Sequence, residues 1–390
     1  MKIVIDDKIP FLKGVLEPYA SILYKNGASI SSEDVKEADA LIIRTRTRCN
    51  AGLLNGSTIR FIASATIGHD HIDEKYCKDS HIVWTNAPGC NAGSVVQYVA
   101  AALCFWSDQT GNPLRGKSIG IVGVGNTGSG VAGLCRSLGM RVLQNDPPRE
   151  RREGSDAFVD LQTIFEEADM ISLHVPLNRG GENKTCHLIN AESLSKMDRC
   201  SLLINTSRGE VVDNMALKKA LQKGQIKNAV LDVWENEPEI DRTLILHLLL
   251  ATPHIAGYSA DGKATGTAMA VRAIARHFGL SDLESWFPES IPPPDRPEST
   301  PHDGDTDGES LLKQAILHSY PIDQDDARLR DSPQNFERFR GNYPLRREFP
   351  AYKIRLNKKK GPQQKQLEKL GFRIAASSPE GRDCGIIAIA

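Results

Sequence analysis

The feature that most constrains the fold is a glycine-rich turn, Gly123-Val124-Gly125-Asn126-Thr127-Gly128, which directly follows the apolar run Lys117–Val122. In such a turn Gly123 permits a tight bend, Gly125 lets the backbone approach a pyrophosphate, and Gly128 lets the next helix pack close to the strand. Free N–H groups at the start of that helix then face the anion. The pattern predicts an α/β protein with a Rossmann-type, doubly wound parallel sheet.

The next apolar run, Arg141–Asn145, ends at Asp146. A carboxylate at this place accepts hydrogen bonds from ribose hydroxyls and repels a 2′-phosphate, so it favours NAD over NADP. Three arginines follow Pro147-Pro148, and Arg can accommodate a 2′-phosphate. We interpret these arginines as part of a solvated loop; they are Arg149, Arg151 and Arg152.

Three later segments each follow an apolar run that is typical of a strand. The runs are Ser201–Ile204, Asn228–Leu231 and Leu246–Ala251, and the segments are Asn205–Gly209, Asp232–Pro238 and Thr252–Gly257. An open parallel sheet binds its ligands outside the carboxyl ends of its strands. We therefore expect Arg208, Glu237 and His254 to meet in one crevice.

These three side chains suit the oxidation of a hydroxyl that lies beside a carboxylate. His254 accepts a proton near neutral pH, and Glu237 orients the imidazole and favours its charged form. Arg208 offers a planar fork that matches a carboxylate. Taken singly, the residues suit a helix cap, a surface carboxylate and a salt bridge. Together, at three strand ends, they indicate proton and hydride transfer.

The order of these motifs resembles that of the D-isomer-specific 2-hydroxyacid dehydrogenase family, from residue 1 to about residue 280. The other segments that carry the resemblance are Lys2–Asp6, Ala65–His71, Ala87–Asn91 and His254–Tyr258. The resemblance implies that Arg208, Glu237 and His254 are the catalytic residues, with His254 as the acid/base.

The resemblance also implies which residues contact the cofactor and the substrate. Besides the glycines Gly123, Gly125 and Gly128, the expected NAD contacts are Asn126, Thr127, Asp146, Thr206, Ser207, Arg208, Asp232 and Gly257. Val175 departs from the family pattern, in which a hydroxyl can face the cofactor, so we expect only a backbone contact there. The expected substrate contacts are Thr45, Thr66 and Tyr258.

Arg44, Arg46 and Arg48 alternate along the chain. On an extended segment alternation places all three on one face. Such a face can protect a sheet edge from pairing with another chain, or it can bind phosphate. Resemblance to a subfamily with a phosphorylated substrate favours phosphate, so Arg44 and Arg46 join the expected substrate contacts. Arg346 or Arg347 of the partner subunit is a competing source of positive charge.

The arrangement of the runs predicts three domains. Helices at Ser94–Ser107 and Ala264–Phe278 are expected to cross between two of them, which makes the substrate domain discontinuous, with an active-site cleft at the hinge. The expected boundaries are a flavodoxin-like substrate-binding lid at 1–98 and 257–285, an NAD-binding Rossmann domain at 99–256, a proline-rich linker at 286–310 and a C-terminal domain at 311–390.

The C-terminal domain is expected to be a small α+β unit. A helix is predicted at Leu311–Leu317, a strand at Tyr352–Leu356 and a solvated turn at Lys358–Lys360, and Arg373–Ala390 suggests no function. Tyr320–Glu348 resembles the dimerisation domain of one subfamily, which implies that this domain pairs with its twin and that the protein is a homodimer.

Composition excludes several classes of function. Lys plus Arg number 48 and Asp plus Glu 49, so a net charge of −1 provides no general attraction to nucleic acid or membrane. No apolar run approaches the roughly 20 residues that span a bilayer. The eight cysteines form no C-x-x-C pair, so we expect no metal site. Lys2–Asp6 is typical of a strand rather than of a signal peptide, so we expect a cytoplasmic protein.

These features favour an NAD-dependent dehydrogenase that oxidises a small phosphorylated 2-hydroxy acid. One alternative is a phosphoglycerate or hydroxypyruvate dehydrogenase of the same family with a different pocket. Another is an NAD-sensing corepressor that binds the cofactor without catalysis. The complete set of Arg208, Glu237 and His254 favours an enzyme.

Overall fold

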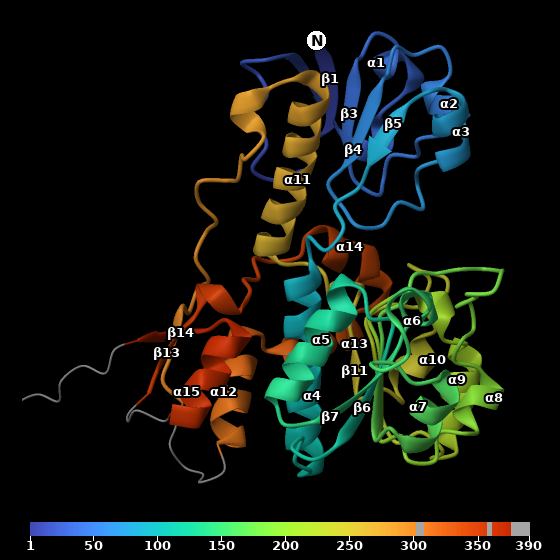
Figure 1. Cartoon of the computed structure of the whole chain (residues 1–390), viewed down its shortest axis with the longest axis vertical. Coiled ribbons are helices and arrows are strands. Elements are labelled where there is room, and N and C mark those ends of the chain that lie inside the picture. The colour runs from blue at the N-terminus through green and yellow to red at the C-terminus, as the bar shows by residue number, and fades with distance from the viewer. Residues whose placement is uncertain (302–307, 357–360, 376–390) are drawn as a thin grey trace, which may run out of the picture.

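Two parallel sheets, one in each lobe of the molecule, dominate the structure (Figure 1). It is a computed structural model that describes residues 1–301, 308–356 and 361–375. The upper sheet has the strand order β2-β1-β3-β4-β5, which is the flavodoxin-like order. Its strands are β1 (Lys2–Asp6), β2 (Ser21–Lys25), β3 (Ala40–Ile43), β4 (Phe61–Ser64) and β5 (Val83–Thr85).

Helices cover both faces of the upper sheet, as its wholly buried central strands require. Ala270, Val271 and Ile274 of the long helix α11 (Ala260–Phe278) pack in the core of one face. The other face carries α1 (Ser32–Val35), α2 (Ala51–Leu54) and α3 (Glu74–Asp79). The chain therefore returns to this lobe after building the lower one, as the two expected crossing helices imply.

The lower sheet is the expected doubly wound sheet, with the order β11-β10-β9-β8-β6-β7. The order reverses beside β6, which is where such sheets bind ligands. Its strands are β6 (Ser118–Val122), β7 (Arg141–Asn145), β8 (Met170–Leu173), β9 (Leu202–Asn205), β10 (Ala229–Leu231) and β11 (Leu250–Ala251). Helices α4 (Ala92–Thr110) and α5 (Asn126–Ser137) pack in the core of one face. Helices α7 (Leu161–Glu167), α8 (Ala191–Leu194), α9 (Asn214–Gln222) and α10 (Arg242–Ile245) pack in that of the other.

Three local predictions were wrong. Pro147–Glu153 is a helix, α6, rather than a loop, because Asp146 caps it and proline suits its first turn. The strand predicted at Leu246–Ala251 is only β11, because α10 ends at Ile245 and Leu246 is 76% exposed. Residues 44–48 are not extended but turn, with Thr47 N bonded to Arg44 O, so their three arginines do not share a strand face.

The C-terminal segment forms a parallel sheet of β12 (Glu298–Ser299), β13 (Lys353–Arg355) and β14 (Arg373–Ala375). Its helices are α12 (Glu309–Ser319), α13 (Ile322–Asp331), α14 (Phe336–Gly341) and α15 (Gly361–Leu370). The expected helix and strand are thus present, but β12 lies inside the expected linker. The predicted turn at Lys358–Lys360, and residues 376–390 of the segment without a suggested function, lie outside the described residues.

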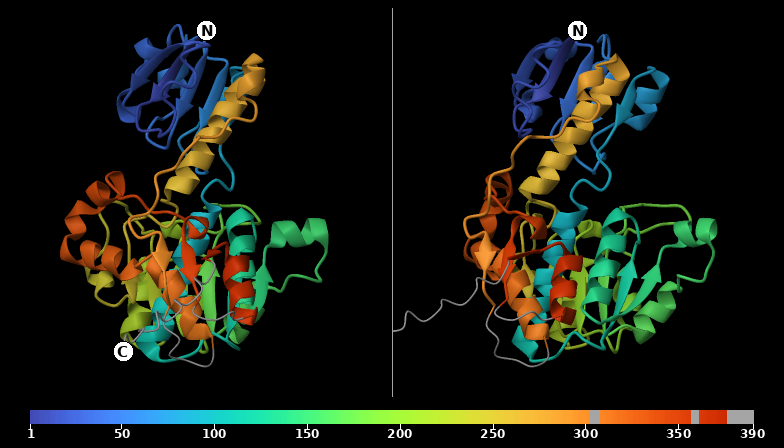
Figure 2. Two further views of the ribbon diagram at one scale, coloured as in Figure 1. Left: turned by 90° about the vertical axis from the view of Figure 1, so that its left-hand side faces the viewer. Right: turned by 60° about the vertical axis from the view of Figure 1, so that its left-hand side comes forward.

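This segment packs against the lower lobe rather than standing apart (Figure 2). Leu311, Leu312 and Ala315 of α12 share one apolar core with α4. Gln366 of α15 donates to the Ser137 carbonyl at the end of α5. We propose that the three units are the domains expected from the sequence, with β12 added to the third.

Candidate active site

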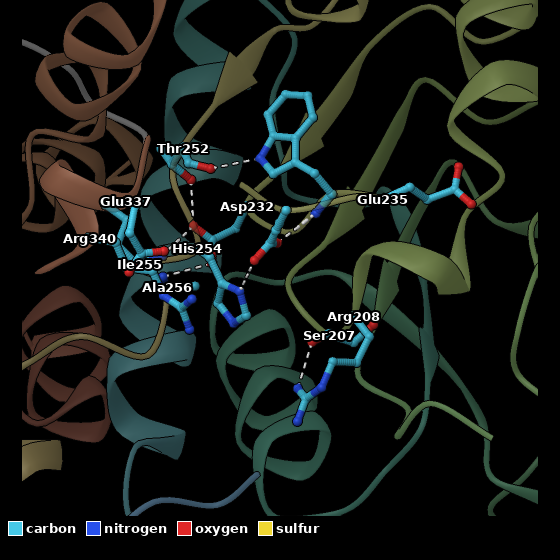
Figure 3. Close-up of polar contacts among 12 residues, drawn as sticks. Ser207, Arg208, Asp232, Glu235, Thr252, His254, Ile255, Ala256, Glu337 and Arg340 are labelled. Atoms are coloured by element: carbon cyan, nitrogen blue, oxygen red, sulfur yellow. Dashed lines mark hydrogen bonds and ion pairs between the residues drawn. The ribbon is translucent and has the colours of Figure 1, made fainter. Parts of the chain in front are cut away.

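Three neighbouring strand ends bring the predicted catalytic side chains into one cavity. The strands β9, β10 and β11 are adjacent and parallel, so the loops that follow them open at the same edge of the sheet (Figure 3). The cavity has a volume of about 440 Å³. It is lined by Arg179, Arg208, Gly209, Glu210, Trp234, Glu235, Asn236, Glu237 and His254.

His254 and Glu237 form a hydrogen-bonded pair. His254 Nδ1 lies 2.7 Å from Glu237 Oε2, and Glu237 Oε1 accepts from the Trp234 N–H at 2.9 Å. Burial alone would raise the pKa of Glu237, but its bond to His254, the His254 charge and the Trp234 N–H bring the pKa below its ordinary value. Glu237 is therefore a carboxylate that holds the imidazole by Nδ1 and leaves Nε2 for a ligand.

Asp232 supports the loop that carries His254. It is 1% exposed and accepts from Thr252 Oγ1 at 2.6 Å and from the N–H groups of Ile255 and Ala256 at 2.8 Å each. Burial raises the pKa of Asp232 above its ordinary value despite these donors. His254 itself has φ +56°, a conformation that is uncommon outside glycine, so the loop needs such support.

Arg208 faces the upper lobe. Its Nη1 donates to its neighbour's carbonyl, Ser207 O, at 2.8 Å, and its Nη2 lies 3.6 Å from Asp70 Oδ2. The next residue must be glycine, because a Cβ at Gly209 would lie 1.9 Å from the Trp234 carbonyl oxygen. Close packing of the β9 and β10 loops therefore sets the position of the guanidinium.

The glycine turn fits the nucleotide that the sequence predicts. Gly123 has φ +86°, and a Cβ at Gly128 would lie 1.9 Å from Gly123 O, so both positions need glycine. Gly125 has open space where its Cβ would stand. Gly125 is also the N-cap of α5 and has no side chain to occupy the first N–H groups, which leaves them for a phosphate.

Asp146 and Arg149 lie beside this turn. Asp146 accepts from the N–H groups of Val124 at 2.8 Å and Arg149 at 3.0 Å. Arg149 donates through Nη1 to Val124 O at 2.5 Å and forms an ion pair with Glu153. Arg149 is thus an ordered neighbour of the nucleotide turn and not the solvated side chain we predicted.

Other predicted cofactor contacts lie along the same edge of the lower sheet. Thr206 Oγ1 lies 3.4 Å from His174 Nδ1, and burial lowers the pKa of His174 to about 3, so this imidazole is neutral. Val175 lies against Gly123, since a Cβ on Gly123 would be 2.9 Å from Val175 Cγ1. Ser207 donates to Asn205 Oδ1, and a Cβ at Gly257 would lie 2.1 Å from Asn91 Nδ2.

The predicted substrate residues Arg44, Arg46, Thr45 and Thr66 have different neighbours. Arg44 is paired with the buried Asp6 at 3.0 Å, and Arg46 with Glu337 of α14. Thr45 and Arg46 line a second cavity of about 700 Å³, together with Asp70. Thr66 Oγ1 lies 2.9 Å from Ser64 Oγ.

Two arginines that we considered as donors from a partner subunit are enclosed within their own chain. Arg346 is 5% exposed and donates to Ala256 O at 2.6 Å and to Ser94 Oγ at 2.5 Å. Arg347 forms an ion pair with Asp261 at 2.9 Å. Arg346 thus braces the loop that carries His254 from behind.

Sequence reasoning missed Asp70, Arg179 and Arg340. Asp70 faces Arg208, Arg179 lines the cavity, and Arg340 Nε donates to Tyr258 Oη at 3.1 Å. Asp70 lies within Ala65–His71, a segment that carries the family resemblance but was assigned no role there, and Arg179 and Arg340 belong to none of the motifs. In the part of the chain that the structure describes, no group of His, Cys, Asp and Glu is arranged to hold a metal ion.

Comparisons with known proteins identify the family of the chain. Residues 99–256 match the family described as D-isomer specific 2-hydroxyacid dehydrogenase, NAD binding domain, and residues 291–371 match a domain of unknown function. Erythronate-4-phosphate dehydrogenase of Bacteroides thetaiotaomicron is 48% identical over 355 residues, which are 91% of this chain and 99% of that protein. The protein of the same name from Porphyromonas gingivalis is 41% identical and covers 91% of this chain and 95% of its own length.

Solved structures show the same fold. D-lactate dehydrogenase of Aquifex aeolicus, complexed with NAD and lactic acid, has a TM-score of 0.60 at 26% identity, over 75% of this chain and all of that one. The 3-phosphoglycerate dehydrogenase of Entamoeba histolytica, with NAD+ bound, has a TM-score of 0.60 at 23% identity, over 73% and 97%.

The chain is therefore an NAD-dependent 2-hydroxyacid dehydrogenase. Its similarity over nearly the full length of these relatives makes it a member of the erythronate-4-phosphate dehydrogenases within the D-isomer-specific 2-hydroxyacid dehydrogenase family.

Proposed function

We propose that this enzyme oxidises 4-phospho-D-erythronate at C2 to (R)-3-hydroxy-2-oxo-4-phosphobutanoate, a step of pyridoxal 5′-phosphate biosynthesis. The names of its relatives supply the substrate. The main support for this chemistry is the His254–Glu237 pair, in which Nδ1 and Oε2 lie 2.7 Å apart. The pair lies in the cavity that Arg208 also lines.

Each catalytic residue has one task in this proposal. Arg208 binds the C1 carboxylate by its guanidinium fork, which places C2 and its hydroxyl in front of His254. His254 Nε2 takes the hydroxyl proton as the C2–H bond breaks, and Glu237 stabilises the imidazolium that forms. NAD, when bound, accepts the hydride from C2. The alcohol thereby loses a hydride and a proton and becomes a ketone.

NAD fits the residues on the other side of the cavity. The N–H groups at the start of α5 would hold its pyrophosphate, and Asp146 would accept from its ribose hydroxyls. The remaining proposed contacts are Asn126, Thr127, Val175, Thr206, Ser207, Asp232 and Gly257. Because Asp232 is buried and already holds three donors, we propose that it acts mainly by positioning the His254 loop.

Steady-state oxidation of three substrates with NAD tests the proposal: 4-phosphoerythronate, 3-phosphoglycerate and glycerate. We expect the highest kcat/KM for 4-phosphoerythronate. A preference for 3-phosphoglycerate would assign the chain to the phosphoglycerate branch, and a preference for glycerate would favour hydroxypyruvate reduction. NAD binding without turnover of any 2-hydroxy acid would favour a corepressor.

We also propose a cytoplasmic homodimer that pairs through the C-terminal domain. The family resemblance supports the pairing. Of the helices within the described ranges, none has the length and apolar character needed to cross a membrane. The proposed substrate contacts are Thr45, Thr66, Tyr258, Arg44 and Arg46.

A further inference from the structure

Two cations flank Tyr258, four residues after His254. Lys263 Nζ, on α11, lies 5.2 Å from the centre of the Tyr258 ring, and the Arg340 guanidinium carbon lies 5.9 Å from it. Arg340 Nε also donates to Tyr258 Oη at 3.1 Å. The two cations come from different parts of the chain: Lys263 follows the catalytic loop, whereas Arg340 is on α14 of the C-terminal segment.

Neither cation is neutralised by a carboxylate. Within residues 1–301, 308–356 and 361–375, no Asp or Glu lies within 4.0 Å of Lys263 Nζ or of the Arg340 guanidinium, and the only hydrogen bond of that guanidinium is to Tyr258. By contrast, Arg44 is paired with Asp6 and Arg46 with Glu337. Lys263 and Arg340 thus lack the carboxylate partner that Arg44 and Arg46 each have.

Two further cations lie near Lys263. Although its side chain reaches solvent, the protein around it lowers the pKa of Lys263, and the nearby cations Arg44 and Arg346 lower it further. A site that holds cations together in this way gains from a bound anion, which would relieve their repulsion.

Arg340 is close enough to act on the reaction centre. Its charge is one of the influences that lower the pKa of Glu237. Figure 3 shows Arg340 on one side of His254 and Arg208 on the other. A substrate whose carboxylate is held by Arg208 would thus extend past His254 toward Arg340. The ion pair between Glu337 and Arg46 ties α14 to the upper lobe and holds this helix over the site.

We propose that Arg340 and Lys263, together with the hydroxyl of Tyr258, bind the phosphate of the substrate and make the enzyme specific for a phosphorylated 2-hydroxy acid. This inference rests on the proposed function. Arg340 supplies N–H donors in a fork that matches phosphate oxygens, and Lys263 supplies a second positive charge for a dianion. The C-terminal domain thereby contributes a specificity residue to the active site of its own chain.

The test compares 4-phosphoerythronate with unphosphorylated erythronate for the wild type, Arg340→Ala, Arg340→Lys and Lys263→Met. The ratio of the two kcat/KM values should fall about 10- to 150-fold in Arg340→Ala, as expected for the loss of one charged hydrogen-bond partner. The fall should arise mainly in KM. Arg340→Lys should recover part of it, and Lys263→Met should lower the ratio independently from a different helix.

Arg338→Ala is the matched control, because Arg338 is an exposed arginine of the same helix that lies against Phe339. It should leave the ratio at the wild-type value. An equal loss on both substrates in Arg340→Ala, with a shifted pH profile, would show that Arg340 acts through Glu237 and would overturn the proposal. So would an unchanged ratio in both Arg340→Ala and Lys263→Met.

A binding measurement separates this inference from the proposed function. Inorganic phosphate should bind the wild type and bind Arg340→Ala at least 10-fold more weakly, measured by calorimetry with NADH present. If the wild type binds phosphate in this way but does not oxidise 4-phosphoerythronate, the proposed function fails and the phosphate site stands. If phosphate binds both proteins equally, the phosphate site fails.

Discussion

At the scale of single residues, the proposed proton chemistry depends on the His254–Glu237 pair. Its two partners come from loops after different strands, and the 2.7 Å bond between them sets which imidazole nitrogen faces the ligand. Asp232 and Arg346 hold the same loop from behind through Ala256. The proton acceptor is thus positioned from three directions.

His254→Ala should lower kcat by at least ~100-fold, the low end for general acid–base catalysis, and leave NADH binding nearly unchanged. Stopped-flow turnover with 4-phosphoerythronate and fluorescence titration with NADH measure the two quantities. Turnover close to that of the wild type would remove His254 from the mechanism.

The depressed pKa of Glu237 should make the pair stabilising only above acidic pH. An acid whose pKa is lower in the folded state stabilises the protein at pH values above its ordinary pKa, which is 4.5 for Glu. This stabilisation is lost as the pH falls through the pKa of the folded state. The difference in unfolding free energy between wild type and Glu237→Gln should therefore shrink as the pH falls below about 4.5. Urea melts from about pH 5 to pH 3 measure it, and a difference that grows as the pH falls below 4.5 would contradict the assignment.

Asp146 should set the choice of cofactor. Asp146→Ala removes the charge that repels a 2′-phosphate, and it leaves Arg149 beside the nucleotide turn. The ratio of kcat/KM with NAD to kcat/KM with NADP should therefore fall toward 1. Adding Arg149→Ala to the Asp146→Ala enzyme should restore part of the NAD preference. A wild type that already prefers NADP would make Arg149, rather than Asp146, the deciding residue.

At the scale of elements, the carboxyl ends of β9, β10 and β11 act as one platform. The loops interlock: a Cβ at Gly209 would meet Trp234 O at 1.9 Å, and Trp234 Nε1 donates to Thr252 O at 3.0 Å. Each loop thereby holds its neighbour, which is why three short segments far apart in sequence keep one geometry.

Gly209→Ala should therefore destabilise the protein by roughly 1–3 kcal/mol, the usual cost of overpacking, and lower kcat/KM because Arg208 moves. The atoms in the way belong to the backbone and cannot rotate aside. Gly133→Ala, with open space at its Cβ in the exposed side of α5, is the control and should be neutral or stabilising. Equal denaturation midpoints for Gly209→Ala and wild type would contradict this account.

At the scale of the whole molecule, the C-terminal segment packs on the lower lobe and supports the loop that carries His254. Its α12 buries apolar side chains against α4, Asp326 accepts from the Ala251 N–H of β11, and Arg346 holds the catalytic loop. It therefore has a structural role within its own chain.

Truncation after Ser285 should expose the apolar face of α4 and release the catalytic loop. We expect aggregation, or a monomer with greatly reduced activity, in sedimentation and turnover assays, whereas the full chain should sediment as a dimer. A truncated protein that remains a soluble dimer would place the interface within the first 285 residues.

The sequence by itself determined the fold class, the strand ends and the chemistry. Regular spacing marks the glycine turn and the acidic strand end, and parallel topology requires Arg208, Glu237 and His254 to share an edge. Family resemblance supplied the remaining proposed contacts. These features are local or follow from topology, so they could be read without coordinates.

Only the tertiary structure decided which charges are neutralised and which segments complete the site. The alternation Arg44–Arg48 favours a phosphate site, but it does not record that the chain turns there or that two of its arginines pair with Asp6 and Glu337. Arg340 carries no motif, yet the packing of α14 brings it to Tyr258. Ion pairing and contact between distant segments depend on how the lobes pack, and a linear pattern does not record that packing.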